Sequence, residues 1–287
     1  MSPLVADLLL YATAASYFAA FLVFLLHLSG NKSFRTAAPK AVGLVAVGAA
    51  LHVAHIIVAS LVLRVCPIMG IHFTMSVVSA LACIVFLFVR FRYKVDVVGV
   101  IVAPVALTFL LASVAVGRGE SADAGPMTSA ILPLHVLANM LGEALFLLAF
   151  AAAVAYLVQE RRLKQKRLTG LFQRLPPLDT LDRAEHGFLL AGFLPLTVGI
   201  VTGALWARKV EAGSIVDVWR AAFGYATWGL FAMVLLMRTV AGWRGRRAAY
   251  GTIAGFGFAV AVLLIYLFRT QGNVGPVAEL VLEIAAR

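Results

Sequence analysis

Three polar side chains recur at every fourth position of the apolar stretch "LHVLANMLGEALFLLAF" (134–150), namely His135, Asn139 and Glu143. Residues four apart share one face of a helix, so imidazole, amide and carboxylate form a single stripe. Imidazole binds metal ions and transfers protons, and a carboxylate inside a membrane is neutral or paired. Glu143 lies roughly 16 Å along this helix. We therefore expect Glu143 to be neutral and hydrogen-bonded to a neighbouring span, or to His52 or His55.

The composition predicts an all-α, polytopic integral membrane protein around this stripe. The chain has 287 residues, of which 62% are hydrophobic and 13% are charged. Soluble domains carry about 25% charged residues, and apolar runs of about 20 residues are long enough to cross a bilayer. Eight transmembrane helices are expected near residues 4–28, 40–64, 71–89, 95–116, 132–159, 184–206, 217–240 and 248–268.

The positive charge is distributed as an orientation signal. Most Lys and Arg residues lie in alternate connectors, at 30–40, 90–94, 159–183 and 238–247. Cytoplasmic connectors carry this excess, so both termini are expected on the outer, periplasmic or extracytoplasmic side of a bacterial cytoplasmic (inner) membrane. The net charge of +11 therefore indicates contact with membrane lipid rather than with nucleic acid.

Connector composition divides the chain into three parts. The small, polar outer connector 117–131 separates an N-terminal four-helix half, 1–119, from a second four-helix core, 120–268. A short interfacial segment, 269–287, follows this core. The long inner connector 159–183 is expected to begin as a basic, helical continuation of the fifth span.

Six histidines fall at three depths of the predicted bundle. The outer pair opens the third and fifth spans, the middle pair lies one turn apart in the second span, and the inner pair lies near the cytoplasmic ends. In that order they are His72 and His135, His52 and His55, and His27 and His186. The middle pair is interpreted either as hydrogen bonding between helices or as metal binding. For the inner pair the alternative to metal binding is a polar residue at the membrane surface, with His27 at a helix end and His186 beside Glu185 in a first turn.

A second informative stretch, 192–231, contains tryptophans around an outer connector. Trp206 precedes the connector and Trp219 follows it, with Arg208 and Lys209 between them. Tryptophan is common at membrane interfaces, so an aromatic belt is one interpretation. The alternative is a flat platform for a large planar ligand such as a porphyrin, whose propionates would be bound by Arg208 and Lys209.

Four segments, taken in order, resemble the cytochrome c assembly family of haem-handling membrane proteins (CcsA/ResC/HemX-like), and within it the HemX-like branch. They are "LHVLANMLGEALFLLAFAAAVAYLVQERRLK", "LPPLDTLDR", "GFLPLTVGIVTGALWA" and "GWRGRRAAYGTIAGFGF". The resemblance implies haem handling at the outer face, with iron ligands beside a tryptophan-rich loop. It assigns His135 as a ligand, Trp206 and Trp228 as loop-flanking tryptophans, and His52 as an upstream intramembrane histidine.

The chain departs from the family pattern at two ligand positions. The family's histidine after the loop-following span is replaced by Leu236, and "YLFRTQGNVGP" after the last span contains no histidine. The loop retains Asp217 and Trp219 of a denser tryptophan pattern. Either another histidine, His72 or His52 with His55 beside it, completes an iron site with His135, or the protein does not hold haem as a cytochrome c synthase does.

These features predict a protein that binds or passes haem in cytochrome c biogenesis, together with a second cytochrome c assembly protein. Two alternatives remain. One is a HemX-like regulator of haem biosynthesis that acts through a cytosolic enzyme, and the other is a structural subunit of a larger membrane complex. The sequence has no signature of a soluble catalytic site, so we expect at most a subunit of a haem lyase (cytochrome c synthase) system.

Overall fold

Eight α-helices and one short 3₁₀-helix make up the described part of the chain. The computed structural model describes residues 3–29, 36–63, 71–93, 95–115, 131–166, 175–207 and 215–270. The elements are α1 (Pro3–Leu28), α2 (Ala37–Leu63), α3 (Ile71–Tyr93), η2 (Asp96–Val98), α4 (Gly99–Ala115), α5 (Ile131–Lys164), α6 (Leu178–Ala207), α7 (Ile215–Val240) and α8 (Arg246–Thr270).

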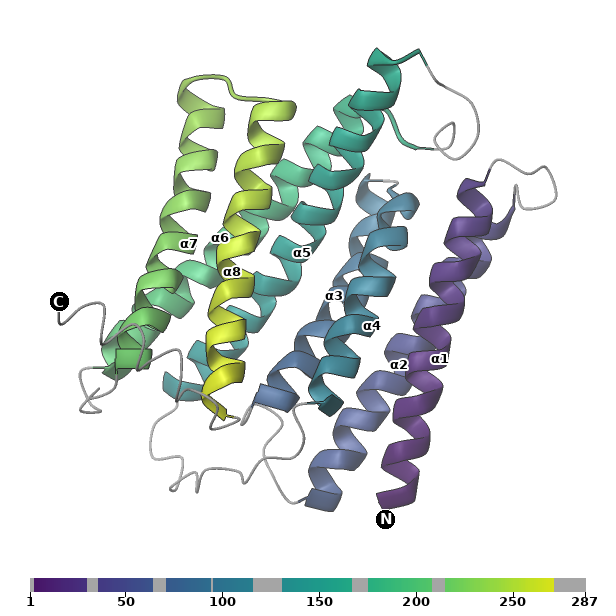
Figure 1. The fold of residues 1–287 in the computed structure, drawn as a ribbon, viewed down its shortest axis with the longest axis vertical. Helices are drawn as coiled ribbons and strands as arrows, with labels where there is room; N and C mark the ends of the chain where they lie inside the picture. Colours follow the sequence, from purple (N-terminus) through teal and green to yellow (C-terminus); the bar gives the residue numbers. More distant parts are fainter. Residues whose placement is uncertain are drawn as a thin grey trace, which may run out of the picture.

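The helices form one bundle in which successive helices run antiparallel (Figure 1). The strongest pairings join chain neighbours, α1 with α2, α3 with α4, α5 with α6, and α7 with α8. Helix α5 also contacts α3 and α8, so it connects the N-terminal helices to the C-terminal ones. The starts of α3, α5 and α7 therefore lie at one end of the bundle, which is the predicted outer end, as the lower part of Figure 1 shows.

The described residues form helices with an apolar exterior, which confirms the prediction of a polytopic, all-α membrane protein. Six helices in the described ranges, α1, α2, α3, α5, α6 and α7, are long and apolar enough to cross a membrane. Helix α4 adds a shorter apolar segment, Gly99–Val114. Large apolar side chains such as Phe88, at 82% exposure, and Leu194, at 66%, point outward. Such a surface is stable in hydrocarbon, where helices satisfy their own backbone groups. The count of eight spans and the orientation of the termini stay predictions.

The helix boundaries differ from the expected ones in ways that matter for function. Helix α5 continues as far as Lys164, so the basic segment after the fifth span begins as helix, as expected. Helix α6 begins at Leu178, immediately after two prolines, and not near residue 184. Pro177 supplies the first carbonyl acceptor, which receives the backbone N–H of Thr180. The early start adds residues 178–183 to α6, which carry the charged residues Asp179, Asp182 and Arg183, and Glu185 follows in the next turn.

Small residues determine how closely α5 and α6 approach. Gly142 of α5 lies against the backbone of Gly192 and Leu196 in α6. Buried alanines of α5 that lie seven and eleven residues after Gly142, Ala149 and Ala153, share its helical face and continue this surface. Because apolar side chains are as stable in lipid as in a protein core, close van der Waals packing of such residues drives association in membranes. The close approach of α6 to α5 positions the polar residues described next.

Candidate functional site

His135 and Asn139 hydrogen-bond to each other and to neighbouring backbone at the predicted outer end of α5. The Nδ1 atom of His135 lies 2.8 Å from the backbone oxygen of Gly199 in α6. The Asn139 amide donates to the backbone oxygen of His135 at 2.8 Å, and its nitrogen lies 3.2 Å from Nδ1 and 3.3 Å from Nε2 of the ring. A carbonyl can only accept, so Nδ1 carries the proton and Nε2 carries the lone pair. The hydrogen bond thereby selects one tautomer and one orientation of the ring.

Two glycines of α6 make room for these side chains. A Cβ atom at Gly203 would lie 2.7 Å from Cε1 of His135. A Cβ atom at Gly199 would meet the Asn139 amide at a distance shorter than any ordinary contact. The sequence "VGIVTGALW" thus has its two glycines where α6 faces the two polar residues of α5. These glycines have a packing role that the sequence analysis did not identify.

Glu143 does not continue the stripe toward the same partner. Eight residues advance a helix by about 80° beyond two full turns, so Glu143 faces away from α6. It lines a small space with apolar residues of α3, α4, α5 and α8, which are Val78, Phe109, Leu147, Phe256, Ala259 and Val260. Neither His52 nor His55 is among them. The expected hydrogen bond to either histidine is not found in the described part of the chain.

The sequence of this bundle matches a family model. Residues 68–272 match the model described as cytochrome C assembly protein, which covers more than half of the chain. The chain belongs to the cytochrome c assembly protein family. The match includes α3 to α8 and therefore His72, His135 and the tryptophan stretch. It leaves out α1 and α2, which carry His52 and His55.

Named relatives support the same assignment. The chain is 28% identical over 202 residues to the cytochrome c biogenesis protein CcsA of Guillardia theta, covering 63% of this chain and 65% of that protein. It is 27% identical over 233 residues to the protein of the same name from Microcystis aeruginosa, covering 64% and 70%. A 97-residue segment is 38% identical to the Gloeothece citriformis protein, covering 33% and 28%. The chain thus spans about two-thirds of the length of the relatives that it matches over long ranges.

The other predicted ligand residues of the family core are only partly described. His72 opens α3 and Trp206 ends α6, but the side chains of both lie outside the described residues. Arg208 and Lys209 also lie outside the described residues. Trp219, in the first turns of α7, is 49% exposed, and its ring lies 6.3 Å from that of Phe223. Because α3, α5 and α7 all begin at the same end of the bundle (Figure 1), the first turns that carry His72, His135 and Trp219 lie at that end.

Trp228 is a packing residue between α6 and α7. Its indole N–H donates to the hydroxyl of Thr197 at 3.1 Å. Its ring stacks on Phe193 with 5.6 Å between centroids. Both interactions keep the indole inside the helix interface. We infer that Trp228 fixes α7 against α6, beneath the end where Trp219 lies.

His52 lies in a separate polar network in the N-terminal helices. Its Nδ1 atom lies 3.2 Å from the hydroxyl of Tyr17, and its Nε2 atom lies 2.9 Å from the hydroxyl of Ser76. His52 is fully buried, and its ring lies 6.3 Å from that of His55. His55 hydrogen-bonds through Nδ1 to the backbone oxygen of Ala6 at 2.8 Å. In this conformation His52 connects α1, α2 and α3, which fits the hydrogen-bonding interpretation of the middle pair.

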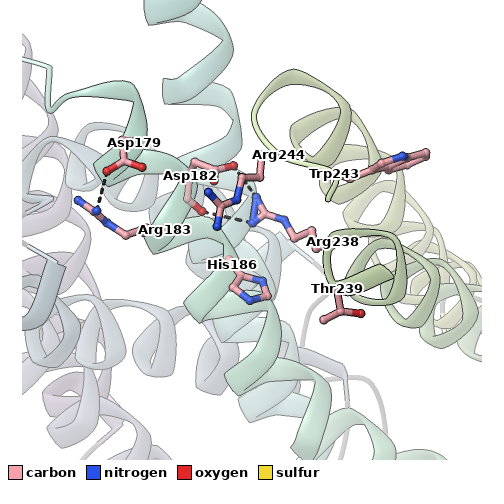
Figure 2. Close-up of a pocket in the computed structure, with 8 residues that line it drawn as sticks. All are labelled: Asp179, Asp182, Arg183, His186, Arg238, Thr239, Trp243 and Arg244. Carbon is pink, nitrogen blue, oxygen red and sulfur yellow. Dashed lines mark hydrogen bonds and ion pairs between the residues drawn. The ribbon is translucent and has the colours of Figure 1, made fainter. Parts of the chain in front are cut away.

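The structure adds a charged cluster that the sequence analysis missed. Arg238, near the end of α7, donates to Asp182 at 2.6 Å and lies 3.5 Å from Glu185. Glu185 is fully buried and accepts the Thr252 hydroxyl at 2.5 Å. Asp182 also accepts the backbone N–H of Gly245 at 2.8 Å. These contacts join α6, α7 and α8 at the predicted inner end, and Figure 2 shows Asp182 and Arg238 facing each other.

A sequence signal for this cluster existed. Asp182, Glu185 and His186 follow one another at spacings of three and one, so the two carboxylates share a helical face. Arg238 begins the basic segment 238–247, and the sequence indicates only an orientation signal there. Glu185 is fully buried and only 13% of the Asp182 side chain is exposed, and a charge removed from water requires a partner.

His135 has the donor chemistry that haem iron requires. An iron-binding imidazole commonly donates its other ring N–H to a backbone carbonyl, which fixes the ring and makes the ligating nitrogen more basic. His135 has this arrangement, with Gly199 as the acceptor. The described residues thus fit one axial ligand at the predicted outer end of the bundle.

Proposed function

We propose that this protein handles haem in cytochrome c biogenesis, in a bacterial cytoplasmic membrane. It binds haem near the outer face and presents it to a second assembly protein. Membership of the cytochrome c assembly protein family supports this function. So do relatives such as the Guillardia theta protein, which is named as a cytochrome c biogenesis protein.

The observation that carries the proposal is the hydrogen bond from His135 to Gly199. It holds the imidazole in the tautomer that has its lone pair on Nε2, and it orients the ring before any ligand arrives. Pre-orientation reduces the entropy lost on binding, so a transiently bound cofactor can still be held by few contacts. In this proposal Nε2 of His135 binds iron, and it gives up its long contact with Asn139.

The remaining roles rest on position along the helices. His72, at the same end of the bundle, is the proposed opposing ligand, and His52 and His55 are the candidates if His72 does not bind. Trp219 and Trp206 form the proposed platform for the porphyrin face, and Arg208 and Lys209 bind its propionates. Haem supplies iron coordination and vinyl groups for attachment, while this chain binds and orients it.

A second function is favoured by one observation. Helix α5 extends to Lys164 and presents the exposed residues Arg161 and Lys164 beyond the apolar part of the helix. A basic helix at the inner surface suits docking of an acidic cytosolic protein. A HemX-like regulator of haem biosynthesis needs such a surface, whereas a protein that only delivers haem at the outer face does not. A permanent place in a larger membrane complex is a third possibility, and co-purification of further subunits tests it.

The test is the visible spectrum of protein purified from haem-supplied cells. We expect a Soret band in the parent protein and loss of most of that band in His135→Ala. The control is His27→Ala, which changes a histidine at the opposite end of the bundle. An apo protein that takes up no added hemin, or equal loss in both variants, contradicts the proposal. Deletion that changes tetrapyrrole levels but preserves c-type cytochromes favours the regulator.

A further inference from the structure

A cavity at the predicted inner end of the bundle has no role in the proposed haem site. It has a volume of about 210 Å³ and lies between the start of α6, the end of α7 and the turn before α8. Water occupies about 30 Å³ per molecule in the liquid, so the cavity could hold about seven waters or a small polar group. His135 lies toward the other end of the bundle.

Four of the eight residues that line this cavity have basic side chains, which donate hydrogen bonds. Arg183, His186, Arg238 and Arg244 all line it, as Figure 2 shows. Arg238 is the innermost of these, with only 5% of its side chain exposed. Arginine forks bind phosphate oxygens with two parallel hydrogen bonds, so a wall of arginines suits an oxyanion.

The two carboxylates of the cavity wall are already paired. Asp182 accepts from Arg238 at 2.6 Å and from the Gly245 N–H at 2.8 Å. Asp179 pairs with Arg183 at 2.6 Å, but both side chains are about two-thirds exposed, at 68% and 66%. An exposed ion pair of this kind is worth little, so Arg183 can exchange its partner at small cost.

Two residues that line the cavity, Arg238 and His186, each have a buried nitrogen without a hydrogen-bond partner in the described part of the chain. The Nε–H of Arg238 is buried and has no acceptor in the described part of the chain, although Asp182 and Glu185 lie beside its other nitrogens. The Nδ1 atom of His186 is also buried without a partner there. An arginine N–H can only donate, and a buried unsatisfied donor is costly. A ligand that brings oxygens corrects this deficit, while a ligand cation does not.

We propose that this cavity binds a phosphate group, supplied by the headgroup of an anionic phospholipid. Arg244 and Arg183 contact the phosphate from the mouth of the cavity, and Arg238 and His186 contact it from within. The cavity lies between helix ends at the predicted cytoplasmic surface, where anionic lipids concentrate and where basic pockets between helices bind their headgroups. Free phosphate has the same chemistry, and the experiment separates the two sources.

The experiment uses the full-length protein, delipidated in detergent, and measures binding by native mass spectrometry and by thermal shift. The probes are phosphatidylglycerol, diacylglycerol with the same acyl chains, and inorganic phosphate. The test variant is Arg244→Gln, since Arg244 is exposed and its loss should not prevent folding. The control variant is Arg247→Gln, which removes an equally exposed arginine that does not line the cavity.

We expect saturable binding of phosphatidylglycerol, none of diacylglycerol, and a loss of about tenfold or more in Arg244→Gln only, the size expected for one charged hydrogen bond. Saturable binding of inorganic phosphate alone, with the same dependence on Arg244, also supports the phosphate site and makes free phosphate its source. Equal losses in the two variants, equal binding of diacylglycerol, or no saturable binding of either phosphate probe overturns the proposal. Haem content enters none of these measurements, so failure here is distinct from failure of the proposed haem function.

Discussion

Gly203 offers the sharpest test of how α6 positions His135. In Gly203→Ala, the new Cβ would lie 2.7 Å from Cε1 and 3.0 Å from Nδ1 of His135. The shortest ordinary carbon–carbon contact is about 3.5 Å, so the ring must move by about 0.8 Å. Such a shift away from α6 lengthens the 2.8 Å bond from Nδ1 to the Gly199 oxygen beyond the usual hydrogen-bond range.

The expected cost follows from three contributions. Overpacking costs about 1–3 kcal/mol and loss of the hydrogen bond costs about 0.5–1.5 kcal/mol. Replacing a helical glycine with alanine returns about 0.5–1 kcal/mol. The net loss of unfolding free energy is therefore about 0.5–4 kcal/mol. In addition, the imidazole loses its fixed orientation, so we expect the haem content at equal protein concentration to fall severalfold.

The matched control is Gly229→Ala in α7. A Cβ at Gly229 would have no neighbour within 4 Å, so the same substitution should keep or slightly raise stability. Thermal unfolding in detergent and the ratio of Soret to protein absorbance measure both effects. If Gly203→Ala matches Gly229→Ala in both measurements, the packing of His135 against α6 is not what orients its ring.

Three further predictions concern stability and share the thermal-unfolding measurement. Arg238→Met should cost about 3–5 kcal/mol, because it leaves Asp182 and Glu185 buried without their cation; Arg247→Met should have little effect, and equal effects would contradict the pairing. Tyr17→Phe should cost about 1–2 kcal/mol, because Nδ1 of His52 loses the 3.2 Å contact; an unchanged midpoint would mean that this contact contributes nothing. Gly245→Ala should destabilise more than Gly242→Ala. Both glycines have a left-handed φ, of +64° and +63°, but only Gly245 faces Tyr156, and the reverse order would refute the role of that contact.

The helices could be predicted from the sequence because their causes are local. Apolar runs of bilayer length and basic connectors are properties of contiguous residues. The expected span 217–240, for example, corresponds to α7 at 215–240. The start of α6 was misplaced because an apolar window excludes its charged first two turns. Whether such turns are helical depends on buried partners in other helices, which a window cannot include.

The partners of the polar residues could not be predicted, because they are distant in the sequence. His135 meets Gly199, and Glu185 meets Thr252 and Arg238. Helical spacing places His135 and Asn139 on one face but does not state which helix that face meets. It also overstated the stripe, because the drift of a 3.6-residue helix had turned Glu143 toward other helices.

The two ends of α7 are held by interactions of different kinds. Arg238 is bound by charge to α6 at one end, whereas Trp219 at the other end is half exposed. Trp219 lies roughly 28 Å along the helix from Arg238, so a tilt of roughly 5° about Arg238 would move it by about 2.5 Å. Trp228 opposes such a tilt from the middle of α7, because its ring stacks on Phe193 and its N–H donates to Thr197 of α6. The outer end of α7, where Trp219 is half exposed, therefore depends on Trp228 and not only on the distant ion pair of Arg238 for its position.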